Sequence, residues 1–274
     1  MTNVPYRISL IGAGKLAWHL GHRFVATGMQ VTQVCSRRES AARELASQLN
    51  AQSCTALEGV KADVDAIILA VPDDAIESVA ERLAASPGFA GQLVVHTSGA
   101  TGLDILQRHF RRAGVLYPLQ TFSGKEPADF REIPVIVQGT DEEVAGFLQS
   151  MGSRLSSRCV QLDEEQRRLL HLAAVFVNNF TNSLAEAATE ILSIRQLPLS
   201  LLYPLLTATV DKIRSGSSPR DIQTGPATRG DSATMERHRA YLRDRHPHLE
   251  PVYSLLSSLI RLQKTAAPPE IPPG

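Results

Sequence analysis

The sequence predicts an α/β fold in which a doubly wound parallel sheet is followed by an all-α C-terminal domain. Short, nearly continuous apolar runs alternate with helical patterns through the first half, as in parallel strands that helices cover on both faces. After residue 162 only helical periodicity is present. We therefore expect a sheet domain at 1–162, a helical substrate and dimerisation domain at 163–265 and a disordered proline-rich tail at 266–274.

The elements are expected in the following order. Apolar, β-rich runs predict strands at 7–11, 31–38, 51–55, 65–72, 92–97, 114–119, 134–139 and 158–162. The first helix carries Leu16, Leu20 and Phe24 on one face, and later helices of this domain are expected at 39–49, 75–84, 103–112 and 141–151. The second half is expected to hold helices at 164–194, 198–215, 232–245 and 250–264.

The helix expected at 164–194 is apolar around much of its circumference. It contains no Gly or Pro, and Leu172, Phe176, Phe180 and Leu184 are accompanied by further apolar residues. Such a helix is either a fully covered core element or part of a subunit interface. We expect an interleaved homodimer formed through the helical domain.

The turn after the first strand carries the most informative motif. Gly12 and Gly14, with Ala17 in the third small position, match the dinucleotide-binding fingerprint of a strand, a tight turn and a helix. Gly14 lets the backbone approach a pyrophosphate, and the helix N-terminus offers free N–H groups. The residues expected to contact the coenzyme here are Gly12, Ala13, Gly14, Lys15 and Leu16. Small residues also make ordinary turns, so the surrounding strand and amphipathic helix support the interpretation.

The end of the second strand indicates which dinucleotide is bound. NAD-preferring folds place Asp or Glu there to accept from the ribose 2′-hydroxyl, whereas this chain has Ser36, Arg37 and Arg38. A carboxylate would repel a 2′-phosphate, but these side chains would bind it through charge-assisted hydrogen bonds. We therefore expect NADP(H) as the cofactor. The alternative is that both arginines are solvated loop charges.

Polar residues follow two further strands at the carboxyl edge of the sheet, where ligands bind in this architecture. Val71, Pro72 and Asp73 are expected along the coenzyme, although Asp73 could instead cap the next helix, as could Asp74.

His96, Thr97 and Ser98 follow the fifth strand and face the expected nicotinamide position. His96 is expected to contact the coenzyme, and the two hydroxyls are expected to bind substrate. The alternative is that Thr97 and Ser98 only cap the following helix.

Four residues elsewhere are further candidates for substrate binding. Gln120 and Thr121 follow the sixth strand and would form one wall of a pocket, or else pack the seam between the domains. Arg229 and Asp231 precede the helix expected at 232–245, and Arg229 with that helix N-terminus would suit a substrate carboxylate. Asp231 or Ser232 can cap that helix. The alternative is a rigid connector in which Arg229 and Asp231 form a structural pair.

Candidate catalytic residues lie on the long apolar helix, together with Ser98. His171 and Asn178 are seven residues apart and share one face of a regular helix, and Asn179 follows directly. His171 is the best candidate for a general acid because its ordinary pKa suits proton exchange near neutrality. We expect His171, Asn179 and Ser98 to be catalytic. The alternative is that the helix residues are buried polar groups that tie helices together.

Composition excludes several other classes of protein. The 274 residues are 43% hydrophobic, carry zero formal net charge and give a pI of about 7.1, so a nucleic-acid partner is not expected. Cys35, Cys54 and Cys159 match no zinc or CxxC spacing, so no metal site is expected. No apolar run is long enough to cross a bilayer, and the first strand leaves no room for a signal peptide. We expect a cytoplasmic protein that acts on a small molecule, without a membrane partner.

These residues together resemble a known family. The matching segments are Gly12-Ala13-Gly14, Ser36-Arg37, Val71-Pro72-Asp73, His96-Thr97-Ser98-Gly99, Pro118-Leu119-Gln120-Thr121-Phe122, Asn179-Phe180, Gly225-Pro226 and Arg229-Gly230-Asp231. In them the chain resembles a group of bacterial Rossmann-like proteins classed as NADP oxidoreductases, whose C-terminal half is catalogued as a domain of unknown function. The chain is more distantly similar to pyrroline-5-carboxylate reductase and to 6-phosphogluconate and 3-hydroxyacid dehydrogenases.

The resemblance implies an N-terminal NADP(H) domain, a helical dimerisation domain and an active site in the cleft between them. In the hydroxyacid dehydrogenases a lysine is followed one turn later by an asparagine on the first interdomain helix, whereas here His171 is followed by Val175. We expect an NADP(H)-dependent oxidoreductase acting on a small, carboxylate-bearing imine, ketone or hydroxy compound. The alternative is a non-catalytic NADP(H)-binding regulator or partner-binding homodimer, which the missing lysine–asparagine pair favours.

Overall fold

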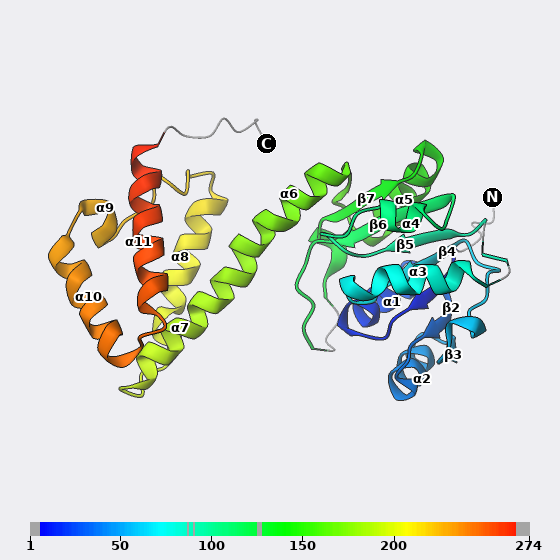
Figure 1. Cartoon of the computed structure of the whole chain (residues 1–274), viewed down its shortest axis with the longest axis horizontal. Helices are drawn as coiled ribbons and strands as arrows, with labels where there is room; N and C mark the ends of the chain where they lie inside the picture. Colours follow the sequence, from blue (N-terminus) through cyan, green and yellow to red (C-terminus); the bar gives the residue numbers. More distant parts are fainter. Residues whose placement is uncertain (1–5, 87, 90, 125–127, 267–274) are drawn as a thin grey trace. The chain divides into compact units, whose positions relative to one another are not determined.

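The computed structural model describes residues 6–86, 88–89, 91–124 and 128–266. It divides into two compact units, Met1–Phe176 and Val177–Gly274. The first contains the sheet and the second is helical (Figure 1). Apart from Ala266, the tail expected to be disordered lies outside the described residues. Among the described residues, no helix combines the length and the apolar character that a membrane span needs.

The first unit is an α/β layer structure, as the sequence predicts. Within the described residues, eight strands form one sheet in the order β3-β2-β1-β4-β5-β6-β7-β8. The strands are β1 (Arg7–Ile11), β2 (Gln30–Cys35), β3 (Gln52–Cys54), β4 (Ala66–Leu69), β5 (Leu93–His96), β6 (Arg112–Pro118), β7 (Val135–Gly139) and β8 (Cys159–Gln161). β1 to β6 run parallel, so their carboxyl ends share one edge.

The direction of β7 differs from the wholly parallel sheet that was expected. β7 pairs antiparallel with β6, from Gly114 opposite Gly139 to Pro118 opposite Val135. Only a short 3₁₀ turn, Phe130–Glu132, lies in the described part of the connection between them. Because a parallel pairing needs a crossover, usually a full helix, strands joined without one pair antiparallel.

Helices cover both faces of the sheet (Figure 1). α1 (Lys15–Ala26), α2 (Glu39–Gln48) and α5 (Glu142–Leu155) contribute to one core, and α3 (Ile76–Ala84) packs into the other. Adjacent residues of β4 show the alternation, because Ile67 belongs to one core and Ile68 to the other, and both are fully buried. This double burial explains why the strands are continuously apolar in sequence.

The helix expected at 103–112 is wrong in its extent. α4 covers only Asp104–Gln107, and Arg112 already belongs to β6, where it pairs with Leu93. Phe110 is 2% exposed within the core on this face of the sheet. The sheet pairing of the following residues therefore ends the helix earlier than local periodicity predicts.

The long helix expected at 164–194 contains an irregular segment. α6 (Glu164–Ala174) begins with a capping box, in which Asp163 accepts from the Gln166 N–H and the Gln166 side chain accepts from the Asp163 N–H. A π-helical segment, Val175–Phe180, follows, and then α7 (Thr181–Ser193). Because the π segment changes the number of residues per turn, residues seven apart across it no longer share one face.

The second unit is entirely helical within the described residues. After α7 it contains α8 (Tyr203–Arg214), α9 (Pro226–Arg229), α10 (Ser232–Arg245) and α11 (Glu250–Thr265). α9 is a single helical turn. It ends at Gly230, whose φ is +73°. The capping expected of Asp231 is present, since its side chain accepts from the Thr234 N–H at 3.0 Å.

Candidate functional site

The glycine turn between β1 and α1 has the conformation that a dinucleotide turn requires. Gly12 has a φ of +115°, and a Cβ atom on it would overlap the backbone carbonyl of Ala70. The Gly12 N–H donates to the Cys35 carbonyl at 2.8 Å, which ties the turn to the end of β2. A Cβ atom on Gly14, which precedes α1, would meet no atom within 4 Å. The backbone therefore requires Gly12, and Gly14 leaves the first turn of α1 open to a ligand.

The end of β2 presents two cations beside this turn. The Ser36 N–H donates to the Cys54 carbonyl at 3.0 Å, and the Ser36 hydroxyl accepts from the Arg38 N–H at 3.4 Å. Arg37 and Arg38 are exposed, and in the described part of the chain neither forms an ion pair with a carboxylate. Both guanidinium groups are therefore available to an anion.

A cavity of about 630 Å³ joins the two segments. Its lining includes Gly12, Ala13, Gly14, Ser36, Arg37, Arg38, Val71 and Pro72, all of which were expected to contact the coenzyme. The lining contains three arginines and no carboxylate. The third, Arg82, is paired with Glu58 at 3.0 Å, so Arg37 and Arg38 carry the uncompensated charge. The cavity is thus chemically suited to a ligand with several phosphates.

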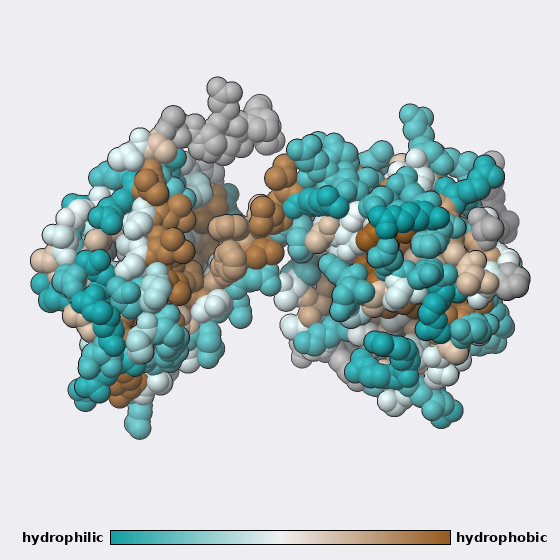
Figure 2. Space-filling view, viewed as in Figure 1, coloured by the Kyte–Doolittle hydropathy of each residue, from teal (hydrophilic) through white to brown (hydrophobic). Residues whose placement is uncertain are grey.

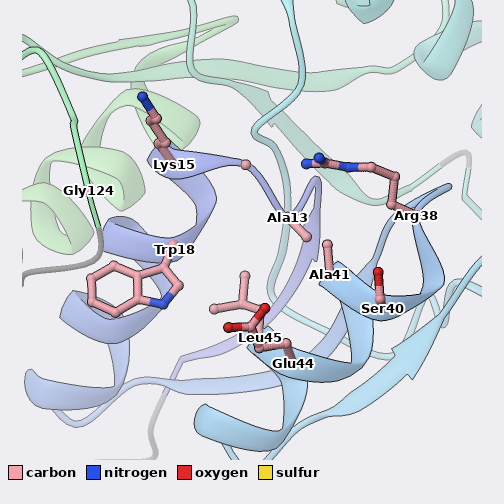
Figure 3. Close-up of a pocket in the computed structure, with 10 residues that line it drawn as sticks. Ala13, Lys15, Trp18, Arg38, Ser40, Ala41, Glu44, Leu45 and Gly124 are labelled. Atoms are coloured by element: carbon pink, nitrogen blue, oxygen red, sulfur yellow. The ribbon is translucent and has the colours of Figure 1, made fainter.

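A second cavity of about 430 Å³ shares Ala13, Gly14 and Arg38 with the first (Figure 3). In Figure 3 the Arg38 side chain extends from the start of α2 across to the glycine turn, and Lys15 rises from the first turn of α1. Lys15 therefore lies at the rim of the expected coenzyme site. Leu16 is half-buried against the core and lines neither cavity.

The turn after β5 uses its polar groups within the protein. His96 is fully buried, and its Nδ1 accepts from the Ser98 N–H at 3.2 Å. Burial, aided by the charge of Arg167, lowers the pKa of His96 to about 3, so this ring is neutral near pH 7. The Thr97 hydroxyl donates to the Leu69 carbonyl at 3.0 Å, and the Ser98 hydroxyl accepts from the Thr101 N–H at 2.9 Å. His96 lines neither cavity, and its contact with the coenzyme remains a prediction.

Tyr117 and His171 form the most promising reactive pair at this edge. The Tyr117 hydroxyl lies 3.0 Å from Nδ1 of His171, and the two rings meet edge to face with centroids 5.8 Å apart. A Cβ atom on Gly99 would come within 2.6 Å of Nδ1 of His171 and 2.7 Å of Cζ of Tyr117. Gly99 therefore allows both rings to pack directly on the turn after β5.

A fully buried arginine fixes the same turn. Arg167, on α6, is 0% exposed, and its Nη1 donates to the carbonyls of Ser98 at 3.1 Å and Gly99 at 2.8 Å. Its Nε donates to the Gln138 side chain at 3.4 Å. α6 thus carries both His171 and Arg167, whose guanidinium group holds the turn after β5 in place.

Burial is the main reason that the Tyr117 hydroxyl keeps its proton. Burial raises the pKa of Tyr117, the negative charge of Asp73 raises it further, and the Arg167 guanidinium opposes them. Asp73, which was expected to contact the coenzyme, therefore acts electrostatically on Tyr117 but does not line the cavity. The alternative reading, that Asp73 or Asp74 caps the next helix, is wrong, because that 3₁₀ turn and α3 begin without a side-chain cap.

The remaining predicted site residues are described within the units that contain them. Gln120 is exposed and accepts from the Thr121 N–H at 2.9 Å. Asn179 is exposed within the π-helical segment, and Arg229 and Asp231 belong to the helical unit. Their roles in catalysis and substrate binding remain predictions.

Tyr117 and Arg167 are the residues that sequence reasoning missed as functional candidates. Tyr117 lies near the end of β6, just before the predicted pocket residues Gln120 and Thr121, but its sequence context gives no sign of His171, its partner 54 positions away. Arg167 lies on the polar first turns of α6, where sequence suggests a solvated cation. Among the described residues, no group of three histidine, cysteine or acidic side chains is placed to hold a metal ion.

Comparisons with known proteins agree with this architecture. Residues 2–120 match the family model of a Rossmann-like domain, and residues 133–260 match the Domain of unknown function (DUF2520). Curated proteins give no match.

Solved structures resemble the chain over nearly its whole length. A candidate NADP oxidoreductase from Bacteroides fragilis is 37% identical, with a TM-score of 0.86 over 94% of this chain and 98% of that one. An imine reductase from Myxococcus stipitatus in complex with NADP⁺ is 16% identical, with a TM-score of 0.67 over 93% of each chain. A 1-pyrroline-5-carboxylate reductase from Streptococcus pyogenes is 16% identical, with a TM-score of 0.59 over 94% and 98%.

The similarities to the imine reductase and to the 1-pyrroline-5-carboxylate reductase show the fold alone. The similarity to the Bacteroides fragilis protein combines a shared fold with 37% sequence identity and nearly complete coverage. The same two regions match in order, a Rossmann-like domain and then the domain of unknown function. The chain therefore belongs to the family of Rossmann-like proteins with a C-terminal DUF2520 domain, together with the Bacteroides fragilis protein.

Proposed function

We propose that this protein is an NADP(H)-dependent oxidoreductase. The observation that carries the proposal is the cavity in which the glycine turn meets Arg37 and Arg38 with no carboxylate in the lining. The names of its relatives add support, because the Bacteroides fragilis protein is described as a candidate NADP oxidoreductase and the imine reductase was solved with NADP⁺.

The residues present fit a 2′-phosphorylated dinucleotide. Gly12 and Gly14 would bring the first turn of α1 against the pyrophosphate, because no side chain fills the approach at Gly14. Ser36, Arg37 and Arg38 would hold the 2′-phosphate, where an aspartate would repel it. When bound, the coenzyme supplies or accepts a hydride at C4 of its nicotinamide.

The proton that accompanies hydride transfer is assigned to Tyr117 and His171. With its pKa raised, the Tyr117 hydroxyl holds its proton near neutral pH and lies within hydrogen-bond reach of Nδ1 of His171. Either side chain can then donate to a substrate nitrogen or oxygen, while the other restores the proton. Arg167 orients the turn on which both rings pack.

The substrate is proposed to be a small imine, ketone or hydroxy compound that bears a carboxylate. The reductases of imines and of pyrroline-5-carboxylate among its relatives suggest this class. Ser98 remains the proposed contact near the reacting carbon, and Arg229 remains the proposed partner of the carboxylate.

We also propose that the protein works as a homodimer of the helical unit. Many large apolar side chains of this unit are exposed in the single chain, among them Val177 at 76%, Leu205 at 67%, Leu255 at 71% and Leu262 at 65%. Figure 2 shows hydrophobic residues gathered along α11. Apolar exposure on this scale marks an interaction surface, and zero net charge gives no repulsion between copies.

Coenzyme selection is tested by titrating NADPH and NADH into the protein and following fluorescence. We expect tighter binding of NADPH, and we expect Arg37→Asp to weaken NADPH far more than NADH, by about tenfold or more for one lost charged contact. Arg111→Asp, an exposed arginine outside the cavity, is the matched control and should change neither affinity. Equal affinities in the unmodified protein, or no binding, would refute the assignment.

Catalysis is tested separately with a panel of cyclic imines, keto acids and hydroxy acids, following coenzyme oxidation or reduction. Turnover that falls at least about a hundredfold in Tyr117→Phe with unchanged NADPH affinity would support the assigned proton donor. Firm NADPH binding without turnover on any substrate would favour the alternative, a non-catalytic NADP(H)-binding regulator.

A further inference from the structure

Two of the three thiols lie side by side at the wall of the coenzyme cavity. Cys35 ends β2 and Cys54 ends β3, and the register of these parallel strands pairs the two residues directly. Registered residues of neighbouring parallel strands project from the same face of a sheet. The Cys35 thiol donates to the Ala56 carbonyl at 3.4 Å, and the two sulfurs interact closely enough to shift each other's pKa.

Both cysteines are connected to the segments that line the cavity. Cys35 is 3% exposed and is itself part of the lining, whereas Cys54 is half-buried. The residues that follow them, Ser36 and Thr55, also line the cavity. The Ser36 N–H donates to the Cys54 carbonyl at 3.0 Å, so a movement of either strand end is transmitted to the other.

We propose that Cys35 and Cys54 form an oxidation site, at which a hydroperoxide drives closure of a disulfide that weakens dinucleotide binding. The prediction that the disulfide forms depends only on the placement of the two thiols on neighbouring strands. Its effect on the dinucleotide rests on the proposed function, because it needs the cavity to be the coenzyme site.

The chemistry has two balanced steps. The Cys54 sulfur attacks one peroxide oxygen, the O–O bond breaks, and the products are a Cys54 sulfenic acid and water, or an alcohol from an organic peroxide. The Cys35 sulfur then attacks the Cys54 sulfur, forming the S–S bond and releasing a second water. The interaction between the two sulfurs lowers the pKa of Cys54 and raises the pKa of Cys35, which burial raises further. Cys54 is therefore the first thiol to react.

Closing the bond must displace the cavity wall. Neighbouring strands lie about 4.8 Å apart, which is within the Cα separation of about 4.4–6.8 Å that disulfides span. The two Cβ atoms, however, must approach to about 3.8 Å, so the strand ends have to be drawn together. Ser36 and Thr55 move with them, and the 2′-phosphate end of the cavity is distorted.

Thermodynamic linkage requires that the disulfide and bound NADP⁺ disfavour each other by the same factor. If the disulfide weakens NADP⁺ binding about tenfold, within the usual range of about 5- to 150-fold for coupled sites, saturating NADP⁺ must disfavour the disulfide by the same factor. For a two-electron couple a tenfold factor raises the reduction potential of the Cys35–Cys54 pair by about 30 mV when NADP⁺ is saturating.

The first measurement asks whether the bond forms. Purified protein is oxidised with hydrogen peroxide, digested without reductant and weighed by mass spectrometry. We expect peptides carrying Cys35 and Cys54 to be joined, two of the three thiols to be lost together, and Cys54→Ser to abolish the cross-link. Cys159→Ser is the matched control, since Cys159 is half-buried in β8 outside the cavity, and it should cross-link like the unmodified protein. Separate oxidation of each thiol without a cross-link would overturn the proposal.

The second measurement asks what the bond does. NADP⁺ affinity is compared in reduced, oxidised and dithiothreitol-rescued protein, with oxidised Cys54→Ser beside them. We expect oxidation to weaken binding about tenfold, rescue to restore it, and oxidised Cys54→Ser to bind like reduced protein. A cross-link that leaves affinity unchanged would refute the coupling while leaving the proposed function intact. Reduced protein that fails to bind NADP⁺ would refute the proposed function and the coupling, and the peptide masses would still decide the cross-link.

Discussion

Gly99 illustrates how tightly individual atoms are constrained at the carboxyl edge of the sheet. Its missing side chain is the space into which Tyr117 and His171 pack. The motif of which it forms part was singled out for its hydroxyls, yet those hydroxyls satisfy nearby backbone groups. The turn thus serves mainly to seat two aromatic rings.

Gly99→Ala should therefore impair catalysis and stability together. The added carbon would lie 2.6 Å from Nδ1 of His171, and relief of that contact separates the Tyr117–His171 pair. We expect a loss of about 1–3 kcal/mol in the free energy of unfolding and a large fall in turnover, with NADPH affinity retained. Urea denaturation and steady-state kinetics measure these effects.

Gly146→Ala provides the control for that substitution. Gly146 is exposed on α5, and a Cβ atom there meets nothing within 4 Å. Alanine should leave turnover unchanged and raise stability by up to about 1 kcal/mol, since glycine is unfavourable inside helices. Equal effects of both substitutions would contradict the role given to Gly99.

His96 should make the protein less stable in mild acid. Its pKa is about 3 in the folded protein against 6.5 in the unfolded chain, so between these values only the unfolded chain takes up the proton. As pH falls below about 6, this one group should lower the free energy of unfolding by about 1.4 kcal/mol per pH unit. Denaturant unfolding between pH 7 and 5 measures the slope, and His96→Asn should have a smaller one. Parallel slopes in the two proteins would disprove the buried neutral histidine.

Sequence predicts which residues line the cavity where a local backbone motif defines them. Gly12, Ser36 and Arg37 line it because one βαβ unit fixes their relative positions, and their contacts with a coenzyme stay predictions. Tyr117 and Arg167 were missed because their roles depend on contacts between distant segments of the chain. Local periodicity carries no information about such contacts.

At the scale of elements, the helix caps explain where several helices begin. α5 begins after Asp141, whose side chain accepts from the Val144 N–H at 2.9 Å, and α6 begins with the reciprocal Asp163–Gln166 capping box. The second cap matters more for function, because the first two turns of α6 carry Arg167 and His171.

Asp163→Ala should test that link between a cap and the site. Loss of the cap should lower the free energy of unfolding by about 1 kcal/mol and reduce turnover, because the start of α6 positions Arg167. Asp141→Ala removes a comparable cap from α5 and should destabilise to a similar extent without reducing turnover beyond it. The two variants are compared by thermal unfolding and kinetics at a temperature where both are folded.

Elements were predicted where hydrophobic pattern alone decides them. The strands of the sheet agree closely with the predicted ranges, because burial on both faces makes their sequences continuously apolar. The antiparallel direction of β7 could not be predicted from its own hydrophobic pattern, because it depends on the segment that connects β6 to β7. The π-helical segment was also invisible, because an apolar run is compatible with either helical geometry.

The whole molecule is expected to be a dimer, and this can be tested by light scattering. We expect a mass of two chains, and we expect Leu255→Glu with Leu262→Glu on α11 to shift it to one chain, since both residues are highly exposed in the single chain. Val25→Glu places the same charge on an exposed apolar residue of α1 in the sheet unit and should leave the dimer intact. A single-chain mass for the unmodified protein at micromolar concentration would rule the dimer out.

The apolar surface of the helical unit has a kinetic consequence. If the proposed dimer forms, a newly made chain keeps these side chains in water until a second copy binds, and its folding is completed in a bimolecular step. Refolding after dilution from denaturant should then contain a phase whose rate rises in proportion to protein concentration. At low concentration the chains should remain longer as partly folded intermediates with exposed apolar helices. A chaperone that binds such helices would retain these intermediates.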